Sequence, residues 1–322
     1  MYNIAFSLNI VLPMVILAGV GLCFRYIGFI TKPFLASANK IIFYIGIPSN
    51  IFMSILLVDI GYALDIHLIT FYVGFVLFSY SAIWGLSAIW LKRRKPLISA
   101  MVNGSYRGNL AIVGLPLIIS VLPAIYAARA ALVVAIIIPI YNVLTVVVLQ
   151  KYQEKPSNAK KQTPLSFITS LFMIILKNPP AIGAICGLLV SISGLPLPMF
   201  IHGSIQSLAA LSTPLALIVM GAALSVRLND SRLKYAVLSV VIKVVILPIA
   251  AVALAYVFGL RGYYLVIVGV LSGVPSAVGG YVQVVELGGD AFIAANNVAL
   301  TTVMSALSLT IFLFIFRLVG LI

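Results

Sequence analysis

The feature that most constrains the fold is the recurrence of apolar stretches about 20 residues long along the whole 322-residue chain. A helix of about 20 apolar residues covers the hydrocarbon thickness of a bilayer, roughly 30 Å. Only 8% of the residues are charged, against about 25% in soluble domains. The sequence therefore predicts an all-α protein that crosses a membrane many times.

Ten segments are long enough to cross the membrane. The sixth is the shortest, and the segment 165–177 could either lengthen it or lie flat at the membrane surface. The start of the chain has no basic region, so we interpret it as the first span and not as a removable signal peptide. The predicted spans are 4–24, 39–57, 66–91, 97–122, 126–150, 178–194, 201–226, 235–258, 263–286 and 291–316.

The basic residues indicate the orientation of these spans. Twenty Lys and Arg residues against six Asp and Glu residues give a net charge of +14. In a membrane protein such an excess first indicates which loops are cytoplasmic, so a nucleic acid partner is not needed to explain it. The basic side chains gather in alternate loops, which predicts that both termini lie outside the cell membrane and that the loop 151–163 is cytoplasmic. These side chains are Arg25, Lys32, Lys92, Arg93, Arg94, Lys95, Lys151, Lys155, Lys160, Lys161, Arg227, Arg232 and Lys234.

The hydrophilic linker 151–163 divides the chain into two halves, 1–150 and 164–322, of five spans each. An offset of 166 residues matches positions that shape helices in both halves, because Pro and Gly alter a helix where they stand. Since five is an odd number, the second half must cross the membrane in the opposite sense, which is an inverted repeat typical of secondary transporters. The matched pairs are Pro13 and Pro179, Gly21 and Gly187, Pro48 and Pro214, Ala111 and Ala277, and Gly114 and Gly280.

Two spans carry polar, glycine-bearing runs at their centres. The fourth contains the run 103–109, and the ninth contains the run 271–280 around Pro275. Freed backbone groups in lipid must line a cavity or pack against protein, so we expect two interrupted helices that meet near the midplane. The residues predicted to break or hinge helices are Pro48, Gly114, Pro116, Pro214, Gly273 and Gly279.

Arg107 is the central candidate for a binding residue, because a buried arginine is costly unless it is paired or hydrated. Its partner is either backbone carbonyl oxygen of the unwound segment or a carboxylate that enters from outside, which fits the guanidinium in two-point fashion. Lys243 is a second cation within a span and either snorkels to the surface or takes part in coupling. Asn103 and Asn50 are further polar candidates near the predicted crossing, although Asn50 could equally belong to an ordinary proline kink.

The chain resembles the auxin efflux carrier family, which includes bacterial malonate and malate carriers and plant auxin exporters. The resemblance covers essentially the whole chain and rests on the segments 106–117, 214–217, 274–278 and 178–179, together with Gly221. It implies ten helices in a five-plus-five inverted fold, like that of bile-acid symporters and sodium/proton antiporters. It also implies a scaffold domain, a mobile transport domain and an elevator-like motion.

The resemblance also implies where substrate binds. The crossover of spans four and nine carries over to Arg107, Gly108, Asn109, Val274, Pro275 and Ser276. Plant members have an asparagine near both helix breaks, whereas this chain has Asn109 at the first and no asparagine adjacent to Pro275-Ser276 at the second. This departure favours small carboxylates over an auxin-like substrate.

The leading expectation is a secondary transporter of organic anions, namely small mono- or dicarboxylates such as malate or malonate, in the lipid bilayer. The alternatives are a sodium- or proton-coupled symporter of a bulkier amphipathic anion and a membrane-embedded sensor. An enzyme is disfavoured, because all six acidic residues lie in loops or at span ends and membrane enzymes need acidic metal-binding motifs or a nucleophile with its base. We expect no catalytic residue, metal or cofactor. Coupling to Na⁺ or H⁺, the direction of transport and a homodimeric state stay open.

Overall fold

The computed structural model describes residues 2–56, 64–91, 94–152, 179–194, 196–223, 230–286 and 288–322, and these residues fold into helices joined by short connections. The first half contains α1 (Tyr2–Tyr26), α2 (Lys32–Ile41), the π-turn η1 (Ile42–Gly46), α3 (Ile47–Leu56), α5 (Ile66–Trp90), α6 (Lys95–Tyr106), the π-turn η2 (Leu110–Gly114), α7 (Leu115–Val121) and α8 (Ala124–Tyr152). The second half contains α10 (Pro179–Ser193), α11 (Met199–Ala223), α12 (Leu233–Val241), the π-turn η3 (Ile242–Ile246), α13 (Leu247–Val257), α14 (Tyr263–Gly273), α15 (Val278–Glu286) and α16 (Ala291–Leu318).

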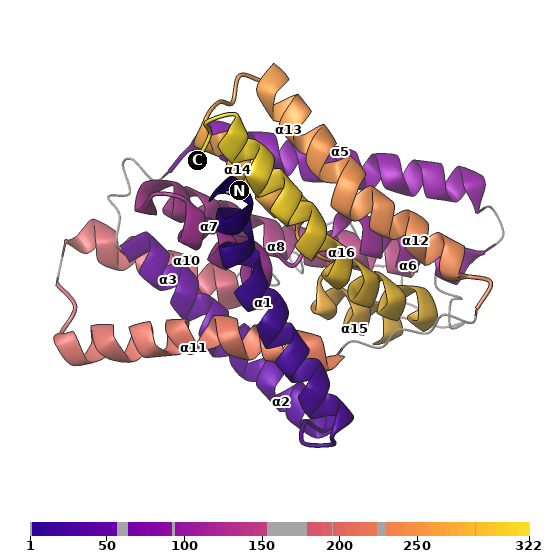
Figure 1. The fold of residues 1–322 in the computed structure, drawn as a ribbon, viewed down its shortest axis with the longest axis horizontal. Helices are drawn as coiled ribbons and strands as arrows, with labels where there is room; N and C mark the ends of the chain where they lie inside the picture. The colour runs from indigo at the N-terminus through magenta and orange to yellow at the C-terminus, as the bar shows by residue number, and fades with distance from the viewer. Residues whose placement is uncertain are drawn as a thin grey trace, which may run out of the picture.

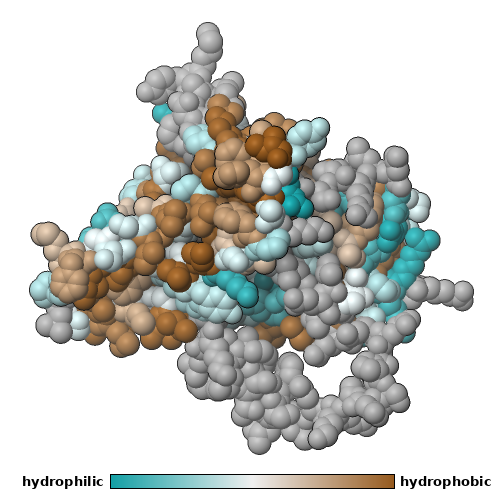
Figure 2. Space-filling view, turned by 90° about the horizontal axis from the view of Figure 1, so that it is seen from below, coloured by the Kyte–Doolittle hydropathy of each residue, from teal (hydrophilic) through white to brown (hydrophobic). Residues whose placement is uncertain are grey.

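Five helical stretches within the described residues are long and apolar enough to cross a membrane. Large apolar side chains remain exposed on the surface of these and neighbouring helices, and Figure 2 shows hydrophobic side chains over much of one face, with hydrophilic ones gathered at an edge. Lipid stabilises such a surface, whereas water does not. The prediction of a polytopic helical membrane protein is therefore confirmed. The five stretches are Ile66–Trp90, Ala124–Leu149, Met199–Val219, Leu233–Val257 and Ala291–Leu318.

Each π-turn is followed two residues later by a proline. Pro48 follows η1, Pro116 follows η2 and Pro248 follows η3. Proline lacks an N–H and its ring collides with the carbonyl four residues earlier, so a wider turn just before it relieves both problems without ending the helix. The chain stays helical at Pro48, and Pro214 lies inside the uninterrupted helix α11, so neither proline ends a helix, and their role as hinges stays a prediction.

The boundaries of the helices differ from the predicted spans in one instructive place. The second predicted span begins at residue 39, but α2 already begins at Lys32, because the Thr31 side chain accepts a hydrogen bond from the Phe34 amide at 3.4 Å and Pro33 occupies the first turn. The predicted linker beyond residue 152, the segment 165–177 and residues 224–226 lie outside the described residues.

The helices gather in two groups (Figure 1). In the first group α1 packs along α11, α3 packs along α10, and α3 also contacts α11. In the second group α5, α6, α8, α12, α13, α14, α15 and α16 pack on one another, with α5 and α13 lying far from α10 and α11 in the view. The groups meet where α1 contacts α16 and where α3 contacts α8.

Glycines allow the backbones of the first group to approach closely. A Cβ at Gly21 would overlap the Ile218 carbonyl, and a Cβ at Gly187 would lie 3.1 Å from the Phe52 carbonyl. The two contacts are reciprocal under the offset of 166, which takes Gly21 to Gly187 and Phe52 to Ile218. A Cβ at Gly221 would similarly overlap the Ala18 carbonyl. Small residues of this kind are the main means by which helices pack in a membrane.

We predict that Gly221→Ala destabilises the protein by about 1–3 kcal/mol, because the added methyl group meets backbone that cannot rotate away. The measurement is thermal unfolding of the purified protein in detergent. Gly203→Ala is the matched control, since Gly203 lies in the same helix with nothing within 4 Å of its added Cβ. Equal melting temperatures for the two variants would contradict the proposed close approach.

Ion pairs tie helix starts together at both ends of the second group. Asp65 caps α5, accepts a hydrogen bond from the Tyr264 hydroxyl at 2.6 Å and lies 3.7 Å from Arg129 of α8. At the far end of the stack formed by α12, η3 and α13, Arg232 pairs at 2.9 Å with Asp290, which caps α16. The first ion pair thus links the starts of α5 and α8, and the second links the starts of α12 and α16.

We predict that acid weakens the first of these contacts. Partial burial alone would raise the pKa of Asp65, but the hydrogen bonds from Tyr264 and the Leu68 amide and the charge of Arg129 lower it below its ordinary 3.8. A lowered pKa contributes stability above the unfolded value that is lost as the pH falls through the folded value. Asp65→Asn should therefore lower the melting temperature at pH 7 and flatten its decline between about pH 4 and pH 2. Parallel curves for the variant and the parent protein would refute the role of this carboxylate.

Candidate functional site

Two helices are interrupted at the predicted places, and the interruptions meet. Helix α6 ends at Tyr106 before η2 begins at Leu110, and α14 ends at Gly273 before α15 begins at Val278. We call the intervening residues 107–109 and 274–277 the crossing. Their backbones form an antiparallel bridge between Gly108 and Ser276. The prediction that the two broken segments come together is confirmed.

The backbone groups released by the interruptions are satisfied across the crossing. The Asn109 amide donates to the Pro275 carbonyl at 2.7 Å, and the Ala277 amide donates to the Arg107 carbonyl at 3.4 Å. The Ser276 hydroxyl donates at 2.5 Å to the Gly104 carbonyl, which in a continuous helix would accept from the Gly108 amide. Each broken helix thus supplies hydrogen-bond partners for the backbone groups that the other leaves unpaired, as burial away from water requires.

Glycine is needed where the two segments touch. A Cβ at Gly108 would lie 2.8 Å from the Val274 side chain and 3.1 Å from Nζ of Lys243. A Cβ at Gly280 would lie 2.8 Å from the Asn103 amide nitrogen. The backbone at these two glycines therefore lies directly against neighbouring side chains, which include the apolar Val274, the amide of Asn103 and the ammonium of Lys243.

Arg107 is buried, with 7% of its surface exposed, and it binds side-chain oxygens. One guanidinium nitrogen donates to Oγ1 of Thr145 at 3.1 Å and to Oε1 of Gln283 at 2.5 Å, and the other donates to Oδ1 of Asn142 at 2.7 Å. The alternative that Arg107 ties down carbonyls of the unwound segment is therefore corrected. All three partners are neutral, and none of the described carboxylates forms an ion pair with Arg107.

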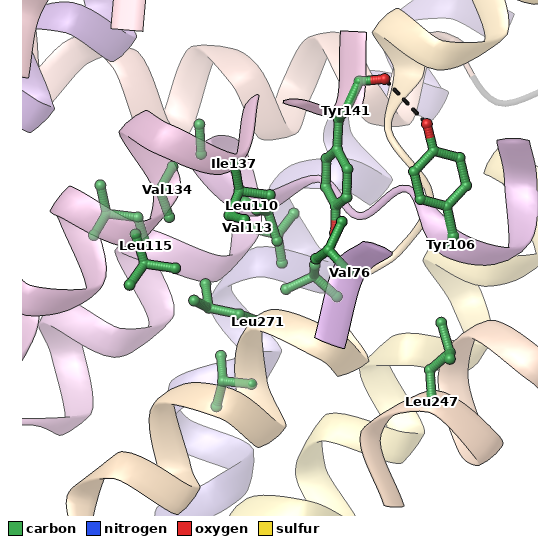
Figure 3. Packing of buried hydrophobic residues seen from close by; sticks show 14 of the residues in the cluster. Val76, Tyr106, Leu110, Val113, Leu115, Val134, Ile137, Tyr141, Leu247 and Leu271 are labelled. Atoms are coloured by element: carbon green, nitrogen blue, oxygen red, sulfur yellow. Dashed lines mark hydrogen bonds between the residues drawn. The ribbon is translucent and has the colours of Figure 1, made fainter. Parts of the chain in front are cut away.

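Thr145 organises this cluster from α8. Its hydroxyl lies 2.9 Å from Oδ1 of Asn103 and 2.9 Å from the Tyr106 hydroxyl, while the Tyr106 hydroxyl also donates to the Tyr141 carbonyl at 3.0 Å (Figure 3). Figure 3 shows this pair of tyrosines beside the buried apolar side chains of η2 and α14. Sequence reasoning missed Thr145 and Gln283, because a single polar residue on one face of an apolar helix carries no local signal of what it faces.

Lys243 is the second buried cation, with 1% of its surface exposed. It lies in η3, and its Nζ donates at 2.7 Å to the carbonyl of Ser272 in the last turn of α14. The alternative that Lys243 snorkels to the membrane surface is therefore wrong. Two cations therefore lie at the crossing, Arg107 within it directly after α6 and Lys243 from η3.

The remaining predicted residues are dispersed. Asn50 lies on α3 and donates to the Ser212 hydroxyl of α11 at 3.3 Å, within the first group of helices. Gly273 is the last residue of α14, so it borders an interruption. The other predicted hinge residues lie in helical turns beyond the breaks, Gly114 in η2, Pro116 in α7 and Gly279 in α15.

An apolar cavity of about 240 Å³ opens between the two helix groups, and Pro275 forms part of its wall. Its lining includes Val15 and Leu22 of α1, Leu117 of α7 and Leu217 of α11. The crossing therefore has an apolar side toward α1 and α11, while the Arg107 side chain points toward α8 and α15.

We predict that Ser276→Ala destabilises the fold by about 1–3 kcal/mol, because it leaves the buried Gly104 carbonyl without its hydroxyl donor. Thermal unfolding in detergent measures the effect. Ser308→Ala is the control, since that hydroxyl only returns to the Ser305 carbonyl of its own helix at 3.4 Å. A loss no larger than that of the control would show that the hydroxyl does not hold the crossing together.

Comparison with known proteins places these observations in a family. Nothing among curated proteins matches the chain. The described residues contain no cluster of His, Cys, Asp and Glu side chains that could hold a metal ion. The model of the family described as "membrane transport protein" matches residues 6–313, nearly the whole chain. The chain therefore belongs to the membrane transport protein family, which is the family of the auxin efflux carriers.

Proposed function

We propose that this membrane transporter is a secondary carrier of small organic anions, namely mono- or dicarboxylates such as malate and malonate, which bind at the crossing. The observation that carries the proposal is the environment of Arg107. Its guanidinium is buried at the meeting point of two interrupted helices and is held by three neutral side chains. A carboxylate is the group that such a cation lacks.

The electrostatics of the crossing favour an anion over a neutral or cationic substrate. Hydroxyl and amide oxygens orient Arg107 but do not cancel its charge, and Lys243 adds a second positive charge bound to a neutral carbonyl. In a medium of low dielectric constant, charges of like sign repel strongly unless an opposite charge joins them. The helical segments that begin at Leu110 and Val278 also start at the crossing, and helix N-termini favour anions.

We further propose ten spans arranged as an inverted repeat of two five-helix halves. The reciprocal contacts of Gly21 and Gly187 support this architecture. The two hydrogen bonds across the crossing also support it, because the bond from Asn109 to Pro275 and the bond from Ala277 to Arg107 interchange under an offset of 168 residues, close to the 166 that relates Gly21 to Gly187. In this proposal both termini lie outside the inner or plasma membrane and the loop 151–163 is cytoplasmic.

The two helix groups suggest how substrate would move. In an elevator-like mechanism the first group, α1, α3, α10 and α11, serves as the scaffold, and the second group carries the crossing. The ion pairs at both ends of the second group, Asp65 with Arg129 and Arg232 with Asp290, would keep it together as it moves. The contact surface between the groups includes the apolar cavity, whose lining presents few polar groups to hold the groups in one position.

One observation favours a second candidate, a carrier of a bulkier amphipathic anion. The cavity of about 240 Å³ reaches Pro275 and is lined by apolar side chains, so an aliphatic or aromatic portion would fit there while a carboxylate lies at the crossing. The experiment that separates the two candidates is flux into proteoliposomes with acetate, malonate, malate and an alkyl-substituted malonate, with and without gradients of Na⁺ and pH. Saturable flux of the short dicarboxylates supports the first candidate, and preference for the alkylated compound supports the second.

We predict that Gln283→Glu separates folding from function. The new carboxylate would lie where Oε1 of Gln283 now accepts from Arg107 at 2.5 Å, so it would neutralise the guanidinium and keep the fold at least as stable. Affinity for the carboxylate substrate should fall at least tenfold, whereas thermal stability should stay level or rise.

Gln283→Leu is the matched variant, because it removes the acceptor without adding charge. It should lower stability by about 1–3 kcal/mol and leave more of the affinity than Gln283→Glu does. Unchanged substrate affinity in Gln283→Glu, measured by flux and by calorimetric titration, would sink the proposed role of Arg107.

A further inference from the structure

The interruption of α14 leaves the Ser272 carbonyl in need of a donor. In a continuous helix the Ser276 amide would donate to the Ser272 carbonyl. Here the Ser276 amide donates instead to Oγ1 of Thr301 at 3.0 Å, and Pro275 has no N–H to offer. The C-terminal end of a half-helix, with its partial negative charge, therefore lies inside the protein at the crossing.

Lys243 fills this position. Its Nζ lies 2.7 Å from the Ser272 carbonyl and 3.1 Å from the place of a Cβ on Gly108, so the ammonium sits where both broken helices meet. The side chain reaches it from η3, the π-turn before Pro248. None of the described carboxylates pairs with Lys243, so carbonyl oxygen and the helix end are what hold the charge.

Carbonyl oxygens at the C-terminal end of a broken helix are the ligands that transporters use for a mobile alkali cation. An ammonium group at hydrogen-bond distance from the same carbonyl excludes such an ion from that place by both volume and charge. Lys243 belongs to η3, so its ammonium group is covalently attached to the helix group that contains the crossing. A substrate anion bound there would therefore not need a dissolved cation at this point to balance its charge.

We propose that Lys243 is a tethered cation that replaces a mobile coupling cation at the end of α14, so that anion transport does not depend on Na⁺. The inference rests on the proposed function for its transport consequence, but the occupancy of the carbonyl site can be tested without substrate. Lys243 is a positioning residue in this scheme, since it acts through the helix end at the crossing.

The test uses the full-length protein with Lys243→Ala, and Lys243→Met as a variant that keeps most of the volume and removes the charge. Thermal unfolding is measured in choline, sodium and ethylammonium salts at equal ionic strength. The wild type should show the same melting temperature in all three. Lys243→Ala should melt at a lower temperature in choline and recover at least half of the loss in ethylammonium, whereas Lys243→Met, whose site stays filled, should not recover.

Flux in proteoliposomes provides the second readout. Wild-type flux of the carboxylate should agree within twofold between sodium and choline, and Lys243→Ala should lose at least tenfold in choline and regain flux with ethylammonium. Lys234→Ala is the control, because Lys234 lies on the same helix stack with its ammonium over the ring of Tyr235, 5.2 Å from the ring centre and away from the crossing. This control should behave like the wild type.

Three results would overturn the inference. They are a wild-type flux that requires Na⁺, a Lys243→Ala variant that transports normally in choline, and a folded Lys243→Ala variant that neither ethylammonium nor Na⁺ stabilises. If the wild type moves no carboxylate at all, the proposed function fails. Recovery of the Lys243→Ala melting temperature by ethylammonium would still support the tethered cation in that case.

Discussion

The structure depends on an exchange of hydrogen bonds between two helices that are each broken inside the membrane. A gap in a helix exposes amides and carbonyls to a medium that offers no water, and each such group costs several kcal/mol if it stays unpaired. The bonds from Asn109 to Pro275, from Ala277 to Arg107 and from Ser276 to Gly104 remove that cost. Neither broken helix could exist alone, so the crossing holds the two halves of the chain to each other.

The same geometry explains why two cations gather at the crossing. A broken helix presents carbonyls at one end and amides at the other, and Lys243 binds the carbonyl end of α14 while Arg107 follows the end of α6. Their partners are neutral, so the site is positive without a resident counter-charge among the described residues. The proposed carboxylate would balance this excess positive charge. The neutral side chains of Thr145, Gln283 and Asn142 hold the guanidinium of Arg107 in place before the carboxylate binds.

The sequence revealed this site in part. Polar and glycine-rich runs around Arg107 and Pro275 stand out in an otherwise apolar chain, so both interruptions and their meeting could be predicted. Gln283, Asn142 and Thr145 could not be assigned to Arg107, because one polar residue in an apolar helix reads the same whether it faces a cation, another helix or a local carbonyl. Proline at 48 does not end its helix, because a preceding π-turn lets the helix continue, and the sequence alone did not distinguish this from a break.

By itself the sequence determined that the chain is helical, membrane-spanning and interrupted at two places, because hydrophobic length and the local effects of Gly and Pro are properties of neighbouring residues. Only the tertiary structure decided what surrounds each charge. Lys243 in η3 and Ser272 in α14 are 29 residues apart in sequence. The ammonium of Lys243 lies at the crossing and not at the membrane surface because a break in another helix leaves the Ser272 carbonyl free to accept its hydrogen bond. Contacts of this kind arise from packing between distant segments, so no local pattern encodes them.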